Sequence, residues 1–167
     1  MISITIIIPI WNKLELTKAC LHSISHIDSA EIIIIDNGST DNSYQWIENN
    51  FPNIKIIQNS KNMGVTAAWN QGLKLASGDY ICIANNDLIF SIDCIETLAS
   101  TLQKHSWIGL ASPYTFQDKN RNVPFFALPA VAYGKNNFTL YKQHNRIGYT
   151  GWCFMFRKQD SLKGFDP

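Results

Sequence analysis

The sequence of 167 residues has little charge and no concentration of one sign. Charged residues make up 16% of the chain, the formal net charge is +1, and neither a basic run nor an acidic tail is present. Proteins that bind nucleic acid normally carry a strongly positive face, so we expect no nucleic-acid partner. The apolar run at 4–10 is far shorter than the roughly 20 residues that span a bilayer, and no signal-peptide pattern precedes it. We therefore expect a soluble, cytoplasmic protein, with contact to the inner face of the membrane through a partner or substrate left open.

Metal-binding and phosphate-binding signatures are also scarce. The four cysteines form no C-x-x-C pair, and Cys20 and Cys82 lie among apolar residues, as is typical of core residues in a reducing compartment. His22 and His26 have the spacing of zinc ligands on a helix, but without a third ligand a solvated helix face is favoured. Neither G-x-G-x-x-G nor G-x-x-x-x-G-K-[ST] occurs, so a dinucleotide fingerprint and a P-loop are both unsupported.

What the sequence does contain is a regular alternation of apolar runs and helical periodicity. A hydrophobic content of 46% in a chain of single-domain length predicts a packed core. The β-branched runs are typical of strands buried on both faces of a parallel sheet, so we predict an α/β/α sandwich with a mostly parallel central sheet. The predicted strands are 4–8, 32–35, 54–57 and 80–84.

Helices are predicted between these strands. The second helix is expected to be capped by Ser39 or Thr40 and to turn Tyr44 and Ile47 inward. The third is expected to follow 62–64 and to end with Gly78 at its C-cap. Beyond Leu110 the pattern weakens. We expect irregular loops or a β-hairpin over 113–147, a strand over 148–156, and the start of a helix at 159–162.

Polar residues follow the predicted strands at 11–12, 36–39, 59 and 85–87. Such residues are common in any turn, but ligands bind at the carboxyl ends of strands in open parallel sheets, so their convergence on one edge favours a site. Asp87 ends a buried strand and has the character of a ligand for Mg²⁺ or Mn²⁺. These ions are held by one or two carboxylates, with diphosphate oxygens completing the shell.

The order of motifs along the chain resembles the family 2 glycosyltransferases, which bind nucleotide-sugars with a GT-A fold. The matching pieces are Ile-Pro-Ile-Trp-Asn (8–12), Ile-Asp-Asn-Gly-Ser-Thr-Asp (35–41), Asn-Met-Gly (62–64), Asn-Gln-Gly (70–72), Ala-Ser-Gly-Asp-Tyr-Ile (76–81), Asn-Asn-Asp (85–87), Gly-Trp-Cys-Phe-Met-Phe-Arg (151–157) and Gly-Phe-Asp (164–166). This resemblance implies a nucleotide-sugar-binding part over 1–112 and an acceptor-side segment of the same domain over 113–167.

The resemblance also implies an activity and a set of site residues. The activity is metal-dependent, inverting transfer of a sugar from a UDP- or dTDP-sugar to a hydroxyl of a glycan or lipid-linked acceptor, in bacterial surface polysaccharide synthesis. Asp36 would bond the base or ribose, and the helix opened by Asn62 and Gly64 would lie near the nucleotide, where backbone N–H groups favour anions. The implied nucleotide-binding residues are Pro9, Ile10, Trp11, Asn12, Asp36, Asn62, Gly64 and Asn86, with Asp87 for the metal and Trp152 and His144 on the acceptor side.

Several positions depart from the family pattern. Asn85 and Asn86 replace acidic residues, which leaves Asp87 as the only carboxylate of that motif. Trp69 stands where many members carry Arg, so Arg157, Lys61 or the metal would have to balance the diphosphate.

The family's catalytic base usually follows the Gly-Phe-Asp segment, and Asp166 is the closest carboxylate, although a simple turn residue is its other interpretation. We therefore expect a truncated domain. A nucleotide-sugar-binding fragment without transferase activity is the alternative. A sugar-1-phosphate nucleotidyltransferase is disfavoured, because its Gly-rich basic loop is missing after the first strand.

Overall fold

The computed structural model describes residues 2–116, 125–134, 153–160 and 165. The strands are β1 (Ile4–Ile10), β2 (Ala30–Asp36), β3 (Lys55–Gln58), β4 (Tyr80–Ala84), β5 (Leu88–Phe90), β6 (Ile108–Phe116), β7 (Phe125–Gly134) and β8 (Cys153–Arg157). The helices are α1 (Leu14–Ile24), α2 (Ser43–Asn50), α3 (Val65–Leu75) and α4 (Cys94–Lys104), and a short 3₁₀ turn covers Lys158–Asp160. None of the helices in these ranges has the length and apolar composition needed to cross a bilayer.

The described strands form one eight-stranded sheet in the order β3-β2-β1-β4-β8-β6-β7-β5. Strands β3, β2, β1 and β4 run parallel. Strand β8 is antiparallel to β4 and places Cys153 opposite Ala84 and Arg157 opposite Tyr80. The antiparallel pair β6–β7 is a hairpin, one of the two alternatives that the sequence left open, although β6 begins at Ile108, before the predicted range. Strand β5 pairs parallel with β7. Four of the seven pairings are parallel, as expected for the mostly parallel sheet.

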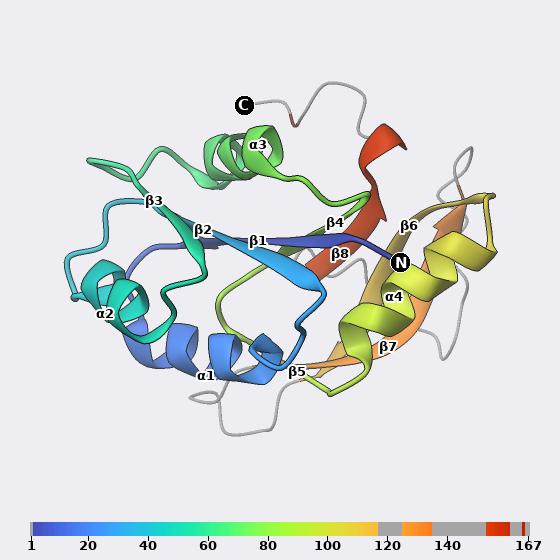
Figure 1. Cartoon of the computed structure of the whole chain (residues 1–167), viewed down its shortest axis with the longest axis horizontal. Helices are drawn as coiled ribbons and strands as arrows, with labels where there is room; N and C mark the ends of the chain where they lie inside the picture. The colour runs from blue at the N-terminus through green and yellow to red at the C-terminus, as the bar shows by residue number, and fades with distance from the viewer. Residues whose placement is uncertain (1, 117–124, 135–152, 161–164, 166–167) are drawn as a thin grey trace.

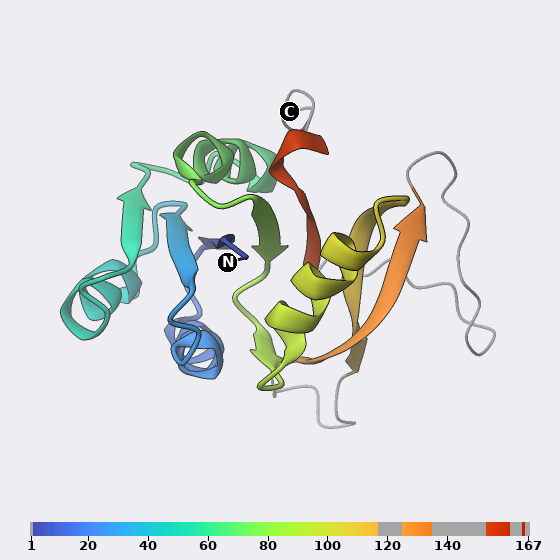
Figure 2. The same ribbon diagram turned by 45° about the vertical axis from the view of Figure 1, so that its right-hand side comes forward.

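Helices cover both faces of this sheet. Helix α3 lies on one face, and α1, α2 and α4 lie on the other (Figure 1). The turned view shows α4 in front of the β6–β7 hairpin (Figure 2), and α4 contacts β6, β7 and β8. This arrangement is the predicted α/β/α sandwich.

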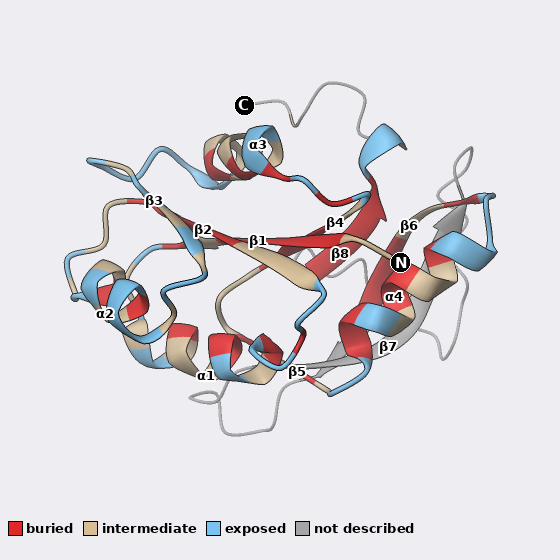
Figure 3. Ribbon diagram, in the orientation of Figure 1, coloured by how far each residue is buried: buried red, intermediate tan, exposed pale blue. Residues whose placement is uncertain are grey.

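The core lies along β1, β2 and β4, in which most residues are buried, whereas β3 at the edge of the sheet is largely exposed (Figure 3). In β1, Ile6 and Ile8 join the core on the α1 side, whereas Ile7 joins the core under α3. Alternate residues of a strand point to opposite faces, so a continuous run of isoleucines fills both sides of the sheet. The apolar runs therefore predicted these strands correctly.

Two helix boundaries differ from the prediction. Helix α2 begins at Ser43, after Asn42 in the left-handed conformation (φ 63°), and Ser39 and Thr40 lie outside it. Its inner face carries Ile47, as predicted, together with Ser43, while Tyr44 is half-buried.

Helix α3 ends at Leu75, so Gly78 is not its C-cap. A Cβ at Gly78 would lie 2.6 Å from the backbone nitrogen of Thr5, and the Gly78 N–H donates to Thr5 Oγ1 at 2.9 Å. The glycine is needed because the chain passes this close to β1.

The four cysteines, scattered in the sequence, gather in the core on the α1 and α4 side as free, buried thiols: Cys20, Cys82, Cys94 and Cys153. The sulfurs of Cys82 and Cys153 are 3.6 Å apart on neighbouring strands. Burial raises the pKa of the Cys20 and Cys94 thiols to about 12. These cysteines behave as small core residues.

The zinc interpretation of the two histidines is not supported. The His22 ring packs against Trp46 and Phe51, at centroid distances of 6.1 and 5.6 Å, and His26 Nε2 lies 3.2 Å from the Ile92 carbonyl oxygen. The described part of the chain contains no group of three His, Cys, Asp or Glu side chains placed to hold a metal.

Candidate functional site

The carboxyl ends of β1, β2 and β4 bring their polar turns to one edge of the sheet. Ile10 pairs with Asp36, and Asp36 pairs with Gln58 on β3. Backbone hydrogen bonds continue past the strands, from Asn37 N to the Ile10 carbonyl and from Asn59 N to the Asp36 carbonyl, both at 2.8 Å. The edge is therefore a set of loops with fixed positions relative to one another.

The turn after β1 is fastened to the turn after β2 by Asn12. Its backbone N–H donates to Ser39 Oγ and its Oδ1 accepts from the Thr40 N–H, both at 2.8 Å. Asn12 has a left-handed backbone, with φ 58°. The side chain of Ile10 is buried in the core, so only its backbone reaches the edge, whereas Trp11 is 56% exposed there. Of these residues, Trp11 is the one whose side chain is free to meet a ligand.

Asp36 organises the turn that follows β2. Its carboxylate accepts from the Ser39 N–H at 2.8 Å and from Gln58 Nε2 at 3.4 Å, and the residue is fully buried. Direct contact with a base or ribose would require the residues around Asp36 to move, because the side chain has no exposed surface. Gly38, at φ +78°, completes the turn against Lys61: a Cβ there would lie 2.9 Å from the Lys61 Cα.

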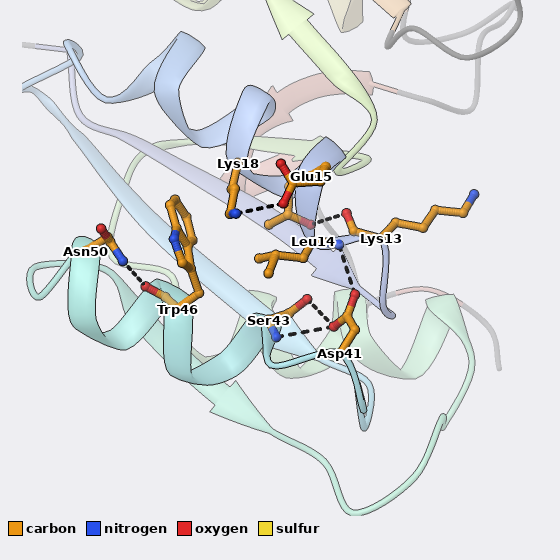
Figure 4. Close-up of polar contacts among 9 residues, drawn as sticks. Lys13, Leu14, Glu15, Lys18, Asp41, Ser43, Trp46 and Asn50 are labelled. Atoms are coloured by element: carbon orange, nitrogen blue, oxygen red, sulfur yellow. Dashed lines mark hydrogen bonds and ion pairs between the residues drawn. The ribbon is translucent and has the colours of Figure 1, made fainter.

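Asp41 joins the first turns of two helices (Figure 4). Its Oδ2 accepts from the Leu14 N–H of α1 at 2.9 Å, and its Oδ1 accepts from the Ser43 N–H of α2 at 3.2 Å. Burial alone would raise the pKa of this carboxyl, but the hydrogen bonds from Ser43 and Leu14 outweigh it and lower the pKa. Sequence reasoning missed this role, although Asp41 closes the 35–41 motif.

Helix α3 begins at the same edge with an open N-terminus. Asn62 Oδ1 accepts from the Gly64 N–H at 2.9 Å, no side chain caps the helix, and a Cβ at Gly64 would meet no atom within 4 Å. Exposed N–H groups at a helix N-terminus attract anions. Asn62 and Gly64 therefore shape a place that suits a phosphate.

A network of side-chain amides fixes the start of α3. Asn37 Nδ2 donates to the Gly64 carbonyl at 3.2 Å, and Asn59 Nδ2 donates to Asn37 Oδ1 at 2.9 Å. Asn59 and Gln71 exchange two further hydrogen bonds of 2.9 Å each. Sequence reasoning did not predict this network, because its members come from three separate elements.

Asp87 carries the clearest chemical signal at this edge. Its Oδ1 is buried and has no hydrogen-bond partner among the described residues. Burial raises the pKa of the Asp87 carboxyl, and the positive charge of Lys13 acts in the opposite direction. A buried carboxylate oxygen without a donor fits a hard divalent cation, because such ions take oxygen ligands. Lys13, which sequence reasoning did not select, places a positive charge near Asp87.

Asn86 is engaged elsewhere. Its Nδ2 donates to Thr17 Oγ1 of α1 at 2.9 Å, so this amide holds the Asn-Asn-Asp turn against the helix. The described ranges contain no group of three acidic, His or Cys side chains placed to hold a metal, so Asp87 is the candidate metal ligand because of its unpartnered oxygen alone. A bound nucleotide would add diphosphate oxygens as further ligands.

Arg157 does not serve the diphosphate as the sequence suggested. It ends β8, opposite Tyr80, which begins β4, so it lies at the far edge of the sheet. Its guanidinium donates to the carbonyls of Ile108 at 2.7 Å, His105 at 2.9 Å and Leu102. Arg157 therefore caps the C-terminal end of α4, where a cation is favoured. The predicted site residues His144, Trp152 and Asp166 lie outside the described residues.

Comparisons with known proteins agree with this geometry. The family model "Glycosyl transferase family 2" matches residues 5–164. The chain is 28% identical over 131 residues to the glycosyltransferase GlyG of Streptococcus pneumoniae, covering 74% of this chain and 43% of that protein. It is 27% identical over 169 residues to WcaA of Escherichia coli, a putative colanic acid biosynthesis glycosyl transferase, covering 95% of this chain and 59% of that protein. The chain thus spans roughly half the length of these curated relatives.

Solved structures with the same fold include Staphylococcus aureus TarS in complex with UDP, with a TM-score of 0.71 and 20% identity, covering 95% of this chain and 47% of that chain. A second is glucosyl-3-phosphoglycerate synthase from Mycobacterium tuberculosis in complex with Mn²⁺, UDP and glucosyl-3-phosphoglycerate. Its TM-score is 0.58 at 22% identity, covering 67% of this chain and 43% of that chain. At these identities the likeness establishes the GT-A fold. With a family match over 5–164 and the expected polar edge in place, the chain belongs to the family 2 glycosyltransferases.

Proposed function

We propose that the chain carries the donor-binding part of a metal-dependent, inverting glycosyltransferase that uses a UDP- or dTDP-sugar. The observation that carries the proposal is the unpartnered, buried Oδ1 of Asp87, beside the charge of Lys13 at the carboxyl edge of the sheet. A buried carboxylate with an unused oxygen destabilises a fold unless a ligand supplies what is missing. Asp87 would hold a divalent cation together with a diphosphate, and the cation would supply the missing partner of Oδ1.

We assign the other parts of the nucleotide to different residues at this edge. The open N-terminus of α3 receives a phosphate oxygen, and Lys13 balances part of the diphosphate charge in place of the family's missing Arg. Trp11 offers an exposed ring for the base, beside Pro9 and Asn12. Asp36 would meet the base or ribose only after the residues around it move. The complexes of relatives with UDP, and of one with Mn²⁺, support this assignment.

Mn²⁺ or Mg²⁺, when bound by Asp87, would act as a Lewis acid on the departing diphosphate. The transfer step itself makes one bond and breaks one. The oxygen of an acceptor hydroxyl attacks the anomeric carbon from the face opposite the diphosphate. The bond from that carbon to the phosphate oxygen breaks with its electron pair on the nucleotide, and the hydroxyl proton passes to a carboxylate. Asp166 is our candidate for that base.

The acceptor is a hydroxyl of a glycan or lipid-linked glycan, contacted on the acceptor side by Trp152 and His144. The colanic acid assignment of the relative WcaA supports a role in surface polysaccharide synthesis. The four free thiols support a reducing, cytoplasmic compartment, where the chain would work at the inner face of the membrane.

Calorimetry of UDP binding with and without Mn²⁺ tests the site. Asp87→Asn keeps the shape of the side chain but removes its charge, and we expect Mn²⁺-dependent UDP affinity to fall at least tenfold, which corresponds to about 1.4 kcal/mol. Asp28→Asn is the matched control, because Asp28 is exposed in the turn before β2, at the opposite edge. Unchanged Mn²⁺-dependent binding in Asp87→Asn would show that the metal site is elsewhere.

Incubation with UDP-sugars separates the proposal from its alternative, a nucleotide-sugar-binding fragment without activity. Release or transfer of sugar by the chain supports the enzyme. Tight Mn²⁺-dependent UDP binding with no sugar released supports the binding-only fragment.

A further inference from the structure

Asn70 of α3 makes two hydrogen bonds to the backbone of Phe165, in the acceptor-side segment of the chain. Asn70 Nδ2 donates to the Phe165 carbonyl at 2.8 Å, and the Phe165 N–H donates to Asn70 Oδ1 at 2.8 Å. The primary amide thus satisfies both backbone groups of one residue, as a neighbouring strand would. The two residues are 95 positions apart in the sequence. The pair is therefore a long-range tie between the two parts of the chain.

Aromatic packing reinforces this tie. The Phe165 ring lies 5.0 Å from the Trp69 ring, 5.9 Å from Phe154 and 6.3 Å from Phe156, measured between centroids. Phe154 and Phe156 are buried residues of β8, and Phe154 lies opposite Ile83, near the end of β4. Edge-to-face contacts of this kind favour one orientation of the rings. Trp69, at the position where the family carries Arg, is thus occupied in holding Phe165.

The same helix is fixed at the donor edge. Gln71, the residue after Asn70, exchanges two hydrogen bonds with Asn59, which continues through Asn37 to the Gly64 carbonyl at the start of α3. Neighbouring side chains of α3 therefore bind the donor edge on one side and Phe165 on the other. A shift of Phe165 relative to the donor edge requires breaking one of these two sets of bonds.

We propose that Asn70 is a positioning residue that sets the placement of the acceptor-side backbone relative to the donor site. The inference rests on the proposed function, because its consequence concerns the transfer step, for which the segment that includes Phe165 is the proposed acceptor side. The two hydrogen bonds of Asn70 fix the backbone of Phe165 to α3, and the first residues of α3 form part of the donor edge. Loss of the tie leaves donor binding intact and misplaces the acceptor side. Misplacement by about 1 Å is enough to slow a transfer step strongly.

The test compares Asn70→Ala, Asn70→Asp and the control Asn50→Ala. Asn70→Ala removes both hydrogen bonds, whereas Asn70→Asp keeps the acceptor for the Phe165 N–H and loses the donor to the Phe165 carbonyl. Asn50 also bonds a backbone carbonyl, that of Trp46 at 2.8 Å, but within α2 (Figure 4). Three quantities are measured: UDP affinity with Mn²⁺ by calorimetry, the kcat and donor KM of sugar release from a UDP-sugar, and hydrogen exchange of the Phe165 amide by NMR.

For Asn70→Ala we expect UDP affinity and donor KM within twofold of the wild type, kcat at least tenfold lower, and loss of protection at the Phe165 amide. Asn70→Asp should retain that protection in part and give an intermediate kcat, and Asn50→Ala should match the wild type throughout. Sugar release by Asn70→Ala equal to that of the wild type would overturn the inference, as would an equal loss of UDP affinity and kcat. Absence of UDP binding in the wild-type chain would instead overturn the proposed function, while the exchange measurement still reports on the tie.

Discussion

Glu31 provides a stability prediction whose magnitude follows from its contacts. Its Oε2 accepts from Thr5 Oγ1 at 2.6 Å, from the Ser77 N–H at 2.8 Å and from Ser77 Oγ at 2.9 Å, and its Oε1 pairs with Lys55. The carboxylate therefore joins β1, β2, β3 and the turn before β4. Burial by itself raises the pKa of Glu31, but the bonds from Lys55, Thr5 and Ser77 outweigh it and lower the pKa from 4.5 to about 2.

This lowered pKa makes stability depend on pH in a defined direction. The unfolded chain takes up a proton near pH 4.5, whereas the folded chain resists it until about pH 2. The contribution of Glu31 is therefore fully present above pH 4.5 and is lost as the pH falls toward 2. The whole shift corresponds to about 3 kcal/mol at 1.36 kcal/mol per pH unit. Because the Lys55 side chain is 57% exposed and its share is screened, we expect ~2 kcal/mol.

The substitution Glu31→Gln isolates this term. Urea unfolding followed by circular dichroism should show the variant ~2 kcal/mol less stable at pH 7, with the difference from the wild type shrinking toward zero as the pH approaches 2. Glu48→Gln is the matched control, since Glu48 is exposed and bonds only Tyr44 Oη in the described contacts, and it should change stability by less than about 0.5 kcal/mol. A gap between Glu31→Gln and wild type that stays constant from pH 7 to pH 2 would refute the reasoning.

Two further predictions concern packing and the far edge of the sheet. Arg157→Gln should lower the free energy of unfolding by about 2–4 kcal/mol, because carbonyls at the end of α4 lose their donor, and should leave Mn²⁺-dependent UDP affinity unchanged. A tenfold loss of UDP affinity in that variant would contradict this prediction and would show that Arg157 contributes to donor binding. Gly72→Ala should cost about 1–3 kcal/mol in urea unfolding, because its Cβ would lie 2.3 Å from Ile7 Cγ2. In the double variant with Ile7→Ala the costs should be less than additive, and strict additivity would show that the two side chains do not collide.

The parallel half of the fold could be predicted from the sequence because its signals are local. Strand β4 has the predicted bounds, and β1 and β2 extend the predicted runs by two or three residues. An uninterrupted run of β-branched residues has no polar face to turn toward solvent, so such a run predicts a buried strand. By contrast, β5 has three residues and is held by pairing with β7, far along the chain. Neither β5 nor α4, whose first turn has no side-chain cap, was predicted.

The location of the candidate site could be predicted from the sequence, but the roles of its residues could be predicted only in part. Asp36, Gly64 and Asp87 follow predicted parallel strands, and the carboxyl ends of such strands lie at one edge of the sheet, so the sequence alone predicts that these residues lie at that edge. That Asp87 Oδ1 has no hydrogen-bond partner could not be predicted, because it depends on residues that are distant in the sequence. The prediction put Arg157 at the wrong edge of the sheet, because the motif shows that a charged residue ends the strand but not which way the strand runs. An antiparallel β8 carries its last residue to the edge where β4 begins.

The gathered thiols have a practical consequence for measuring how the chain opens. Burial raises the pKa of Cys20, Cys94 and Cys153, so in the native chain these sulfurs are both covered and protonated. An alkylating reagent attacks the thiolate, and it therefore reacts only with molecules whose core has transiently opened. Cys20 on α1 reports on the half of the sheet formed by the parallel strands β3, β2, β1 and β4. Cys94 on α4 and Cys153 on β8 report on the half formed by β8, β6, β7 and β5, whose pairings are mixed. The labelling rates of the individual cysteines would thus show, in native buffer and without an introduced probe, whether the two halves open together or separately.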